Sequence, residues 1–181
     1  MKMPRTAFAL VAILSRACLA AAPVVVASAA IAGCADENDP KTWVKRLDDP
    51  AQRAPAIKRL DEMFNAAMGG ASNNREDPKV KGVIDDSIEG LTKTYTAGGL
   101  DEKTRKDLMK LIADMGDPRG GPALAKAFKD YEPGKNDEDV KFAAQGVSRL
   151  SNTGKLTDQG LIDALWDCFA KFQPSKAKSI N

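Results

Sequence analysis

Four aspartate–proline pairs occur along the chain after residue 38, and each precedes a stretch in which apolar residues recur at helical spacing. The pairs are Asp39-Pro40, Asp49-Pro50, Asp77-Pro78 and Asp117-Pro118. An aspartate side chain accepts hydrogen bonds from the free amides at a helix start. Proline at the first helical position has its φ angle preset and gives up no donor that the helix needs. We therefore expect a helix to begin at each pair.

Apolar side chains after these pairs recur every three or four residues, which is the period of an amphipathic helix. The clearest stripe is Val80, Ile84, Ile88, Leu91 and Tyr95, which ends at Gly98-Gly99. No stretch alternates apolar and polar residues for long enough to form a strand, so the predicted fold class is all-α. Helices are expected over 50–68, 78–97, 101–115, 122–131, 137–150 and 157–173, with a short capping segment around Trp43, Val44 and Leu47.

These predicted helices pair into hairpins, with first members starting near 50, 101 and 137 and partners starting near 78, 122 and 157. Their spacing scatters around the roughly 40–47 residues of HEAT and armadillo repeats. Residues 108–128, with Gly116-Asp117-Pro118-Arg119 between helices and Pro122-Ala123-Leu124 opening the partner, resemble the inter-helix segment of bacterial HEAT repeats. Asp49-Pro50 is a weaker match, and Ser151-Asn152-Thr153-Gly154 departs from the pattern. The resemblance implies an α/α solenoid of about three HEAT-like hairpins, and an irregular helical bundle is the alternative.

Residues 1–33 have the composition of an export signal. Lys2 and Arg5 precede an uncharged stretch, 17–33, that is rich in alanine and valine and ends in small residues. The uncharged stretch contains Pro23 and is short for a bilayer span, which needs about 20 helical residues. An export signal is therefore favoured over a transmembrane anchor.

The end of this leader, Ile31-Ala32-Gly33-Cys34, resembles the lipobox of bacterial lipoproteins. The resemblance implies cleavage between Gly33 and Cys34, diacylglyceryl transfer to the Cys34 sulfur and usually a third acyl chain on the new amino terminus. An ordinary cleaved signal, with Cys34 left as a free thiol, is the alternative. The expected organisation is a signal peptide (1–33), a short polar tether (34–39), a HEAT-like helical repeat domain (40–173) and a tail or the start of a further repeat (174–181).

Charge and residue content exclude several functions. The chain has 27 basic and 25 acidic residues, but Lys2, Arg5 and Arg16 lie in the leader, so residues 34–181 carry 24 against 25, a net charge of −1. That balance gives no electrostatic reason to expect a nucleic-acid partner. The chain contains no histidine, which excludes Ser-His-Asp and Cys-His catalysis and zinc sites that need imidazole. Cys168 lies among apolar helical neighbours, so we predict a buried structural cysteine.

The acidic clusters are interpreted as helix caps and solvated faces. Residues 36–39 and 136–139 lack the ligand pattern of an EF-hand loop and lie at helix starts, where acids complement the helix dipole. Asp85, Asp86 and Glu89 lie off the neighbouring apolar stripe, and no carboxylate is expected in an apolar pocket. The sequence therefore predicts no catalytic residue, no metal ligand and no cofactor.

The aromatic side chains are expected on or beside the core stripes, so no exposed aromatic platform is predicted. In the last helix, however, the apolar residues exceed what one neighbour can cover, and no polar terminal repeat follows them. We therefore expect this end to meet a partner, or the sequence to be a fragment of a longer one. The residues in question are Leu161, Ile162, Leu165, Trp166, Phe169 and Phe172.

The predicted function is that of a non-enzymatic lipoprotein, held to the membrane through acyl chains on Cys34, whose helical repeats bind other proteins of the bacterial cell envelope. Ala35 after the lipidated cysteine fits sorting to the outer membrane rather than the inner membrane in a Gram-negative cell, although Asp36 and Glu37 weaken that inference. Two alternatives remain open. One is an enzyme, of lyase or glycosylase type, because some HEAT-like proteins act on bilin chromophores or alkylated DNA. The other is a purely structural spacer.

Overall fold

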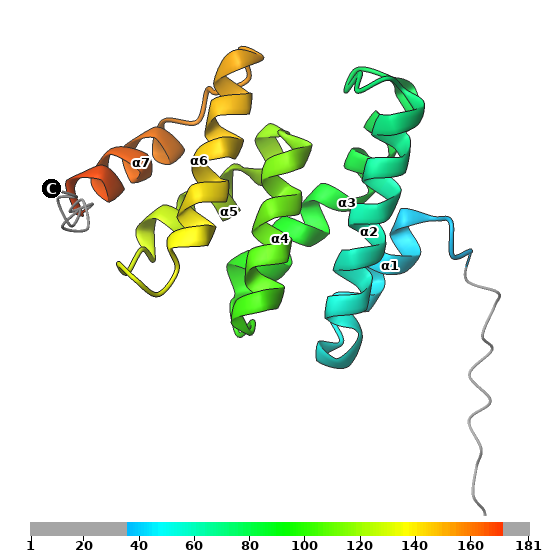
Figure 1. Cartoon of the computed structure of the whole chain (residues 1–181), viewed down its shortest axis with the longest axis horizontal. Coiled ribbons are helices and arrows are strands. Elements are labelled where there is room, and N and C mark those ends of the chain that lie inside the picture. The colour runs from blue at the N-terminus through cyan, green and yellow to red at the C-terminus, as the bar shows by residue number, and fades with distance from the viewer. Residues whose placement is uncertain (1–35, 172–181) are drawn as a thin grey trace, which may run out of the picture. The chain divides into compact units, whose positions relative to one another are not determined.

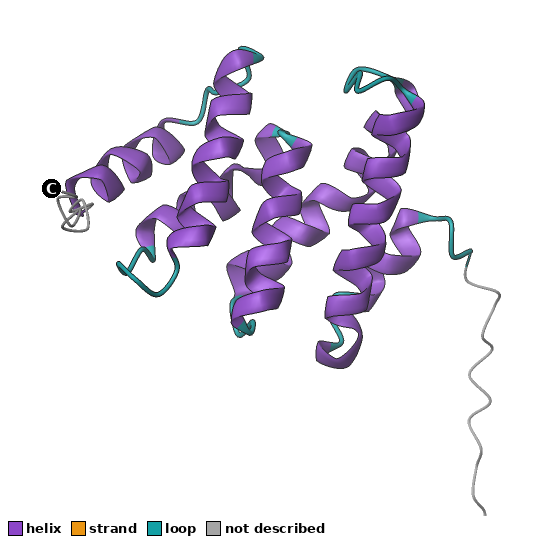
Figure 2. Cartoon of the chain, viewed as in Figure 1, coloured by secondary structure: helices purple, strands orange, loops and turns teal. Residues whose placement is uncertain are grey.

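The computed structural model describes residues 36–171, and every regular element in this range is helical (Figures 1 and 2). The prediction of an all-α chain is confirmed for these residues. The leader, Cys34 and the segment 174–181 lie outside the described residues. The elements are α1 (Pro40–Arg46), α2 (Pro50–Gly70), α3 (Pro78–Ala97), α4 (Glu102–Met115), the 3₁₀ turn η1 (Pro118–Gly120), α5 (Gly121–Lys129), α6 (Asp137–Asn152) and α7 (Gln159–Lys171).

Each aspartate–proline pair begins a helical element, as predicted. The carboxylates of Asp39, Asp49 and Asp77 accept a hydrogen bond from the backbone N–H two residues on, at 3.0, 2.9 and 2.8 Å. Asp117 does the same for η1, at 3.0 Å. These bonds satisfy amides that have no partner inside the helix. The positions of the helix starts therefore follow from local chemistry.

Three helices have boundaries that differ from the prediction. Helix α2 passes through Gly69-Gly70, because the left-handed turn is made by Ser72 and Asn73, whose φ angles are 50° and 63°. The segment 118–120 is a 3₁₀ turn, so α5 begins at Gly121, and it ends at Lys129 rather than at residue 131. Helix α7 begins at Gln159 rather than at 157 or 158. None of these shifts moves an apolar stripe off its buried face.

The helices form two layers, with α2, α4 and α6 in one and α1, α3, α5 and α7 in the other (Figure 1). Helix α4 packs on both α2 and α3, and α6 packs in turn on both α4 and α5. Helix α7 packs on α5. The first helix of each later pair thus lies over both helices of the pair before it.

The predicted hairpins are only partly correct. Helices α2 and α3 pack against one another, but α6 and α7 do not pack along each other. Each of these last two helices makes its main contacts with the preceding pair. The reason is that helix pairs in this fold bury most of their apolar surface between pairs rather than within a pair.

Helix α1 covers the α2–α3 end of the layers, as expected for a capping segment. It contacts both α2 and α3. Gly90 of α3 allows the close approach, because a Cβ atom there would lie 2.4 Å from Cγ1 of Val44. The Trp43 indole donates to the Glu37 carbonyl at 2.9 Å, and the Arg46 guanidinium lies 4.1 Å from the Trp43 ring centre. This end of the stack is therefore closed by side chains of the chain itself.

Helix α4 has neighbours on both sides within its layer, α2 and α6. Its Ile112 approaches Gly120, next to Ile88 of α3. On the other side, the Ala113 backbone lies against Gly146 of α6, where a Cβ atom would come within 3.2 Å of it.

The stripe predicted for α3 is buried as expected, and Cys168 is 4% exposed.

Replacing Gly90 with alanine tests the closed end. Alanine in a helix interior normally stabilises by roughly 0.5–1 kcal/mol relative to glycine. At Gly90 the added methyl group overlaps Val44, so we expect Gly90→Ala to lower the free energy of unfolding by about 1–3 kcal/mol instead. Gly82→Ala in the same helix has open space and should be neutral or stabilising. Urea denaturation measures both variants, and equal effects would contradict the close packing of α1 on α3.

Candidate functional site

Two large aromatic side chains of α7 are exposed. Trp166 is 66% and Phe169 is 59% accessible, and their ring centres lie 5.9 Å apart. The expectation that the aromatic residues form no exposed platform is therefore wrong for this pair. Leu161, Ala164 and Cys168 form the buried side of α7, which packs on α5, and Trp166 and Phe169 lie outside that side. Exposed, adjacent aromatic residues are typical of surfaces that bind another molecule.

An apolar groove lies beside these aromatic residues, where α6 and α7 diverge. Its cavity has a volume of about 220 Å³. We call it the α6–α7 groove. Its lining residues are Phe128, Asp137, Val140, Lys141, Ala144, Leu165, Cys168 and Phe169.

Cys168 forms part of the inner wall of this groove but has no feature of a reactive thiol. It is a free cysteine and is buried. Burial raises the pKa of the thiol above its ordinary value, and the charge of Lys171 opposes the shift only in part. Because the thiolate is the reactive form, Cys168 acts as a small apolar side chain. This agrees with the sequence-based prediction.

A second cavity, the polar pocket, has a volume of about 400 Å³ and lies where α3, α4, α5 and α6 meet. Its lining residues are Tyr95, Gly98, Gly99, Leu100, Arg105, Lys126, Asp130, Glu132, Lys135, Asn136 and Asp139. Three carboxylates and three cations from different elements therefore share one cavity.

Asp139 is the unexpected residue of the polar pocket. The acidic run 136–139 was interpreted as helix-start acids that complement the helix dipole, but Asp139 is only 2% exposed and forms an ion pair with Arg105 of α4. Burial raises the pKa of its carboxyl group, although the charge of Arg105 and the hydrogen bonds from Arg105 and Tyr95 favour the charged form. Asp139 is therefore a desolvated carboxylate in a cavity that is lined mainly by polar and charged residues. Asp139 precedes Ala143 and Gly146 by four and seven residues, so extending the helical period would have placed it on the buried face.

The other charges of the polar pocket are paired locally. Lys126 binds Asp130 at 2.7 Å, and Lys135 binds Glu132 at 2.5 Å. Asn136 accepts from the Glu132 backbone N–H at 2.8 Å and donates to the Asp130 carbonyl at 2.9 Å, so it organises the loop before α6 instead of capping the helix. Each of the three carboxylates that line the pocket thus has a cation as its partner.

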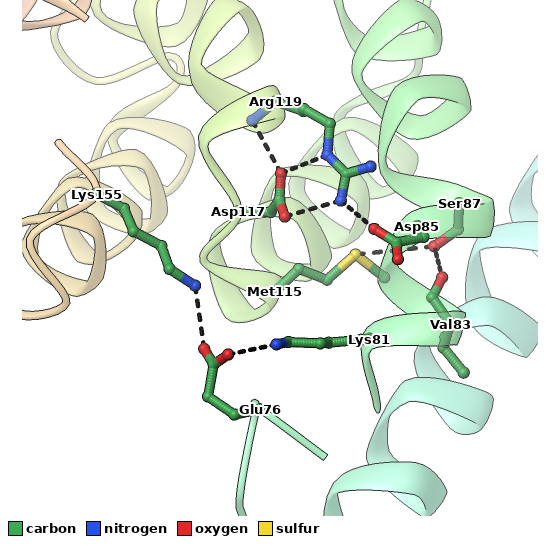
Figure 3. A network of polar contacts seen from close by, with 9 residues as sticks. All are labelled: Glu76, Lys81, Val83, Asp85, Ser87, Met115, Asp117, Arg119 and Lys155. Carbon is green, nitrogen blue, oxygen red and sulfur yellow. Dashed lines mark hydrogen bonds and ion pairs between the residues drawn. The ribbon is translucent and has the colours of Figure 1, made fainter. Parts of the chain in front are cut away.

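A third cluster joins the turns at one end of the helices (Figure 3). Arg119, in η1, donates to both Asp117 oxygens at 2.7 and 2.9 Å and to Asp85 of α3 at 2.6 Å. Burial alone would raise the pKa of Asp117, but the bonds and charge of Arg119 hold it below its ordinary value. The Gly-Asp-Pro-Arg segment therefore positions a cation that ties the α4–α5 turn to α3.

Glu76 extends this cluster across the helix stack. Its carboxylate binds Lys81 at 2.6 Å and Lys155 at 3.2 Å, and these lysines lie 74 residues apart in the chain. Asp86, also expected on a solvated face, forms an ion pair with Lys41 of α1 at 3.2 Å. Asp86 lies off the apolar stripe as predicted, and both acids connect segments that are distant in the chain.

The lipobox residues, including Gly33 and Cys34, lie outside the described residues. Within residues 36–171 no helix is long and apolar enough to cross a bilayer. The same residues contain no group of three or more side chains that is suited to hold a metal ion. No protein-family model matches the sequence, and neither a curated protein nor a solved structure matches it.

The buried ion pair predicts a pH-dependent stability. Because the pKa of Asp139 is higher in the folded than in the unfolded protein, folding favours its protonated form, and that contribution is lost as pH rises through the folded pKa. The unfolding free energy of the wild type minus that of Asp139→Asn should therefore fall with pH above the ordinary aspartate pKa. Each unit by which the folded-state pKa of Asp139 exceeds its unfolded-state pKa changes this free-energy difference by about 1.4 kcal/mol. Urea denaturation from pH 3 to 7 measures it, and a difference that rises with pH would refute the assignment.

Proposed function

We propose that this protein is a lipid-anchored component of the bacterial cell envelope whose HEAT-like α/α stack binds another protein through the α6–α7 groove and the aromatic pair beside it. The exposure of Trp166 and Phe169 is the observation that carries the proposal. Burying such a side chain contributes roughly 1.5–3 kcal/mol. Leaving two of them in water is therefore unfavourable for a chain that works alone.

The packing order of the helices supports the α/α stack. When the sequence of α4 is aligned with that of α6 at an offset of 35 residues, Leu108 falls on Ala143 and the buried stripes of the two helices coincide. The two helices therefore have equivalent positions in successive pairs. Stacked helix pairs bury a continuous core and need a polar cover at each end. Helix α1 covers one end, whereas α7 presents aromatic residues at the other.

The anchor follows from the lipobox-like sequence and fits the geometry of the first described residues. The Asp39 N–H donates to the Asp36 carbonyl at 3.0 Å, and Trp43 binds the carbonyl of Glu37. The predicted polar tether is thus attached to α1 from residue 36 onward. The two residues from Cys34 to Asp36 extend at most about 7 Å, at roughly 3.3–3.6 Å each. Acyl chains on Cys34 would hold the helices close to the lipid headgroups, and two or three chains suffice for stable anchoring.

An enzyme is the alternative with a specific observation in its favour, the buried carboxylate of the polar pocket. A desolvated acid with a defined charge partner in a cavity is a reason to consider catalysis. Here the partner cation is supplied by the chain, and the neighbouring acids each have a lysine. Such pairing suits the joining of α4 to α6, so we favour the binding function.

Site-specific cross-linking in intact envelopes tests the proposed function. A photoreactive benzoylphenylalanine at Phe169 should give a covalent adduct with another protein. The same group at Lys58, an exposed position on α2, should give none. Adding Trp166→Asp to the Phe169 variant should reduce the adduct. In the same cells, Cys34→Ser should abolish palmitate incorporation and membrane fractionation.

Two results would refute separate parts of the proposal. Equal cross-linking at Phe169 and Lys58 would contradict the docking surface. A processed Cys34→Ser protein that still fractionates with membranes would contradict the lipid anchor. Each part can therefore fail without the other.

A further inference from the structure

The polar pocket has the volume of a small-molecule site and a lining whose charges cancel. Its volume of about 400 Å³ lies within the range of ligand cavities in proteins, roughly 300–1,000 Å³. The charged lining residues are three cations and three carboxylates, Arg105, Lys126, Lys135, Asp130, Glu132 and Asp139. We propose that this pocket binds a small zwitterion, of the size of a free amino acid or a dipeptide. This goes beyond the proposed function, because the pocket and the α6–α7 groove have no lining residue in common.

Arg105 is placed to bind the carboxylate of such a ligand. Its Nε atom is paired with Asp139, which is buried and also accepts a hydrogen bond from Tyr95. These partners hold the guanidinium in place, yet 32% of the Arg105 side chain is exposed. Its two Nη nitrogens have no hydrogen-bond partner among residues 36–171. Because a guanidinium can donate two parallel hydrogen bonds to one carboxylate, Arg105 offers a fixed and unsatisfied binding group.

The loop between α3 and α4 adds backbone donors to the same pocket. Gly98 and Gly99 line it with φ angles of 75° and 69°, and a Cβ atom on either would meet nothing within 4 Å. The backbone N–H groups of Gly99 and Leu100 donate to no acceptor within the described part of the chain. Backbone without side chains lets a ligand oxygen approach closely. Arg105 and this loop therefore lack an acceptor, which a ligand carboxylate would supply.

Asp130 and Glu132 are the groups available to the ammonium group of the ligand. Asp130 is paired with Lys126, four residues before it, and Glu132 is paired with Lys135, three residues after it. The four side chains are between 35% and 76% exposed. Ion pairs that are local and exposed contribute little to stability, so exchanging one partner for a ligand charge costs little.

The balance of charge distinguishes a zwitterion from an ion of one sign. The charges of the lining sum to zero, so an anion alone would leave the pocket negative and a cation alone would leave it positive. A zwitterion keeps the sum at zero, because its carboxylate shares the cations while its ammonium group binds the carboxylates that these cations release. Every charged group in the pocket then keeps a partner of opposite sign, which a partly desolvated charge requires.

The test is isothermal titration calorimetry at pH 7 on the full protein, purified from cells in detergent. The probes are alanine and alanyl-alanine. Propionate and ethylammonium serve as matched ligands, because each retains only one of the two charged groups of alanine. We expect saturable binding of at least one zwitterion, at least tenfold tighter than the binding of propionate or ethylammonium.

Arg105→Lys keeps a cation beside Asp139 but removes the paired Nη donors, so it should weaken binding of the zwitterion at least tenfold. Arg59→Lys is the matched control. Arg59 lies on α2, outside the pocket, and is paired with Glu62 of the same helix. This control should leave binding unchanged. Circular dichroism checks that both variants are folded.

A second variant changes the charge balance at exposed positions. Asp130→Asn with Glu132→Gln gives the lining a net charge of +2. This double variant should bind propionate more tightly than the wild type does and the zwitterion more weakly, so the preference reverses. Because both side chains are exposed, it tests the pocket even if Arg105→Lys fails to fold.

The absence of saturable binding by either zwitterion would overturn the inference. Binding of propionate or ethylammonium as tight as that of the zwitterion would also overturn it, because the site would then be one for a simple ion. Unchanged binding in both pocket variants would place the ligand elsewhere. Cross-linking at Phe169 tests a different surface, so its loss would refute the proposed function and leave the zwitterion site standing.

Discussion

The fold depends on the burial of helix pairs against one another. A pair covers one apolar face on its predecessor and offers a second face to its successor, which is why α4, with neighbours on both sides, is enclosed on two faces. A stack held together in this way has two ends, and each end needs a cover. Helix α1 covers the first end through the contact of Val44 with Gly90. Among the described residues, nothing covers the second end, at α6 and α7, where two aromatic residues are exposed.

Polar contacts fix how the pairs are joined rather than providing the main stabilisation. Arg119 ties the α4–α5 turn to α3, and Glu76 joins Lys81 to Lys155 across the stack (Figure 3). Ion pairs this exposed contribute little individually, with a typical value of about 0–1 kcal/mol. The pair of Asp139 and Arg105 is different, because removal of Arg105 would leave the buried Asp139 carboxylate unpaired. It therefore constrains how α6 can lie on α4.

Local features of the sequence predicted the helices well. Aspartate–proline pairs and the 3.6-residue period are short-range signals, so they located the starts and the buried stripe of α3. Features set by the packing of distant segments were predicted less well. Asp139 is buried because Arg105 and Tyr95 reach it from other helices. Trp166 and Phe169 are exposed because, within residues 36–171, α7 packs mainly on α5. Helices α6 and α7 separate because α6 packs on α4 and α5 and α7 packs on α5. No residue pattern within α6 or α7 alone predicts this separation.

The most direct test of the open end is the solvent accessibility of Trp166 in the cell envelope. Hydroxyl-radical footprinting can compare oxidation of Trp166 and Phe169 in intact cells with oxidation in the purified protein, with Trp43 of α1 as the internal reference. If a partner covers the α6–α7 end, Trp166 and Phe169 should be protected in cells, relative to Trp43, and become reactive on purification. Equal oxidation in both states would contradict a docking surface at this end.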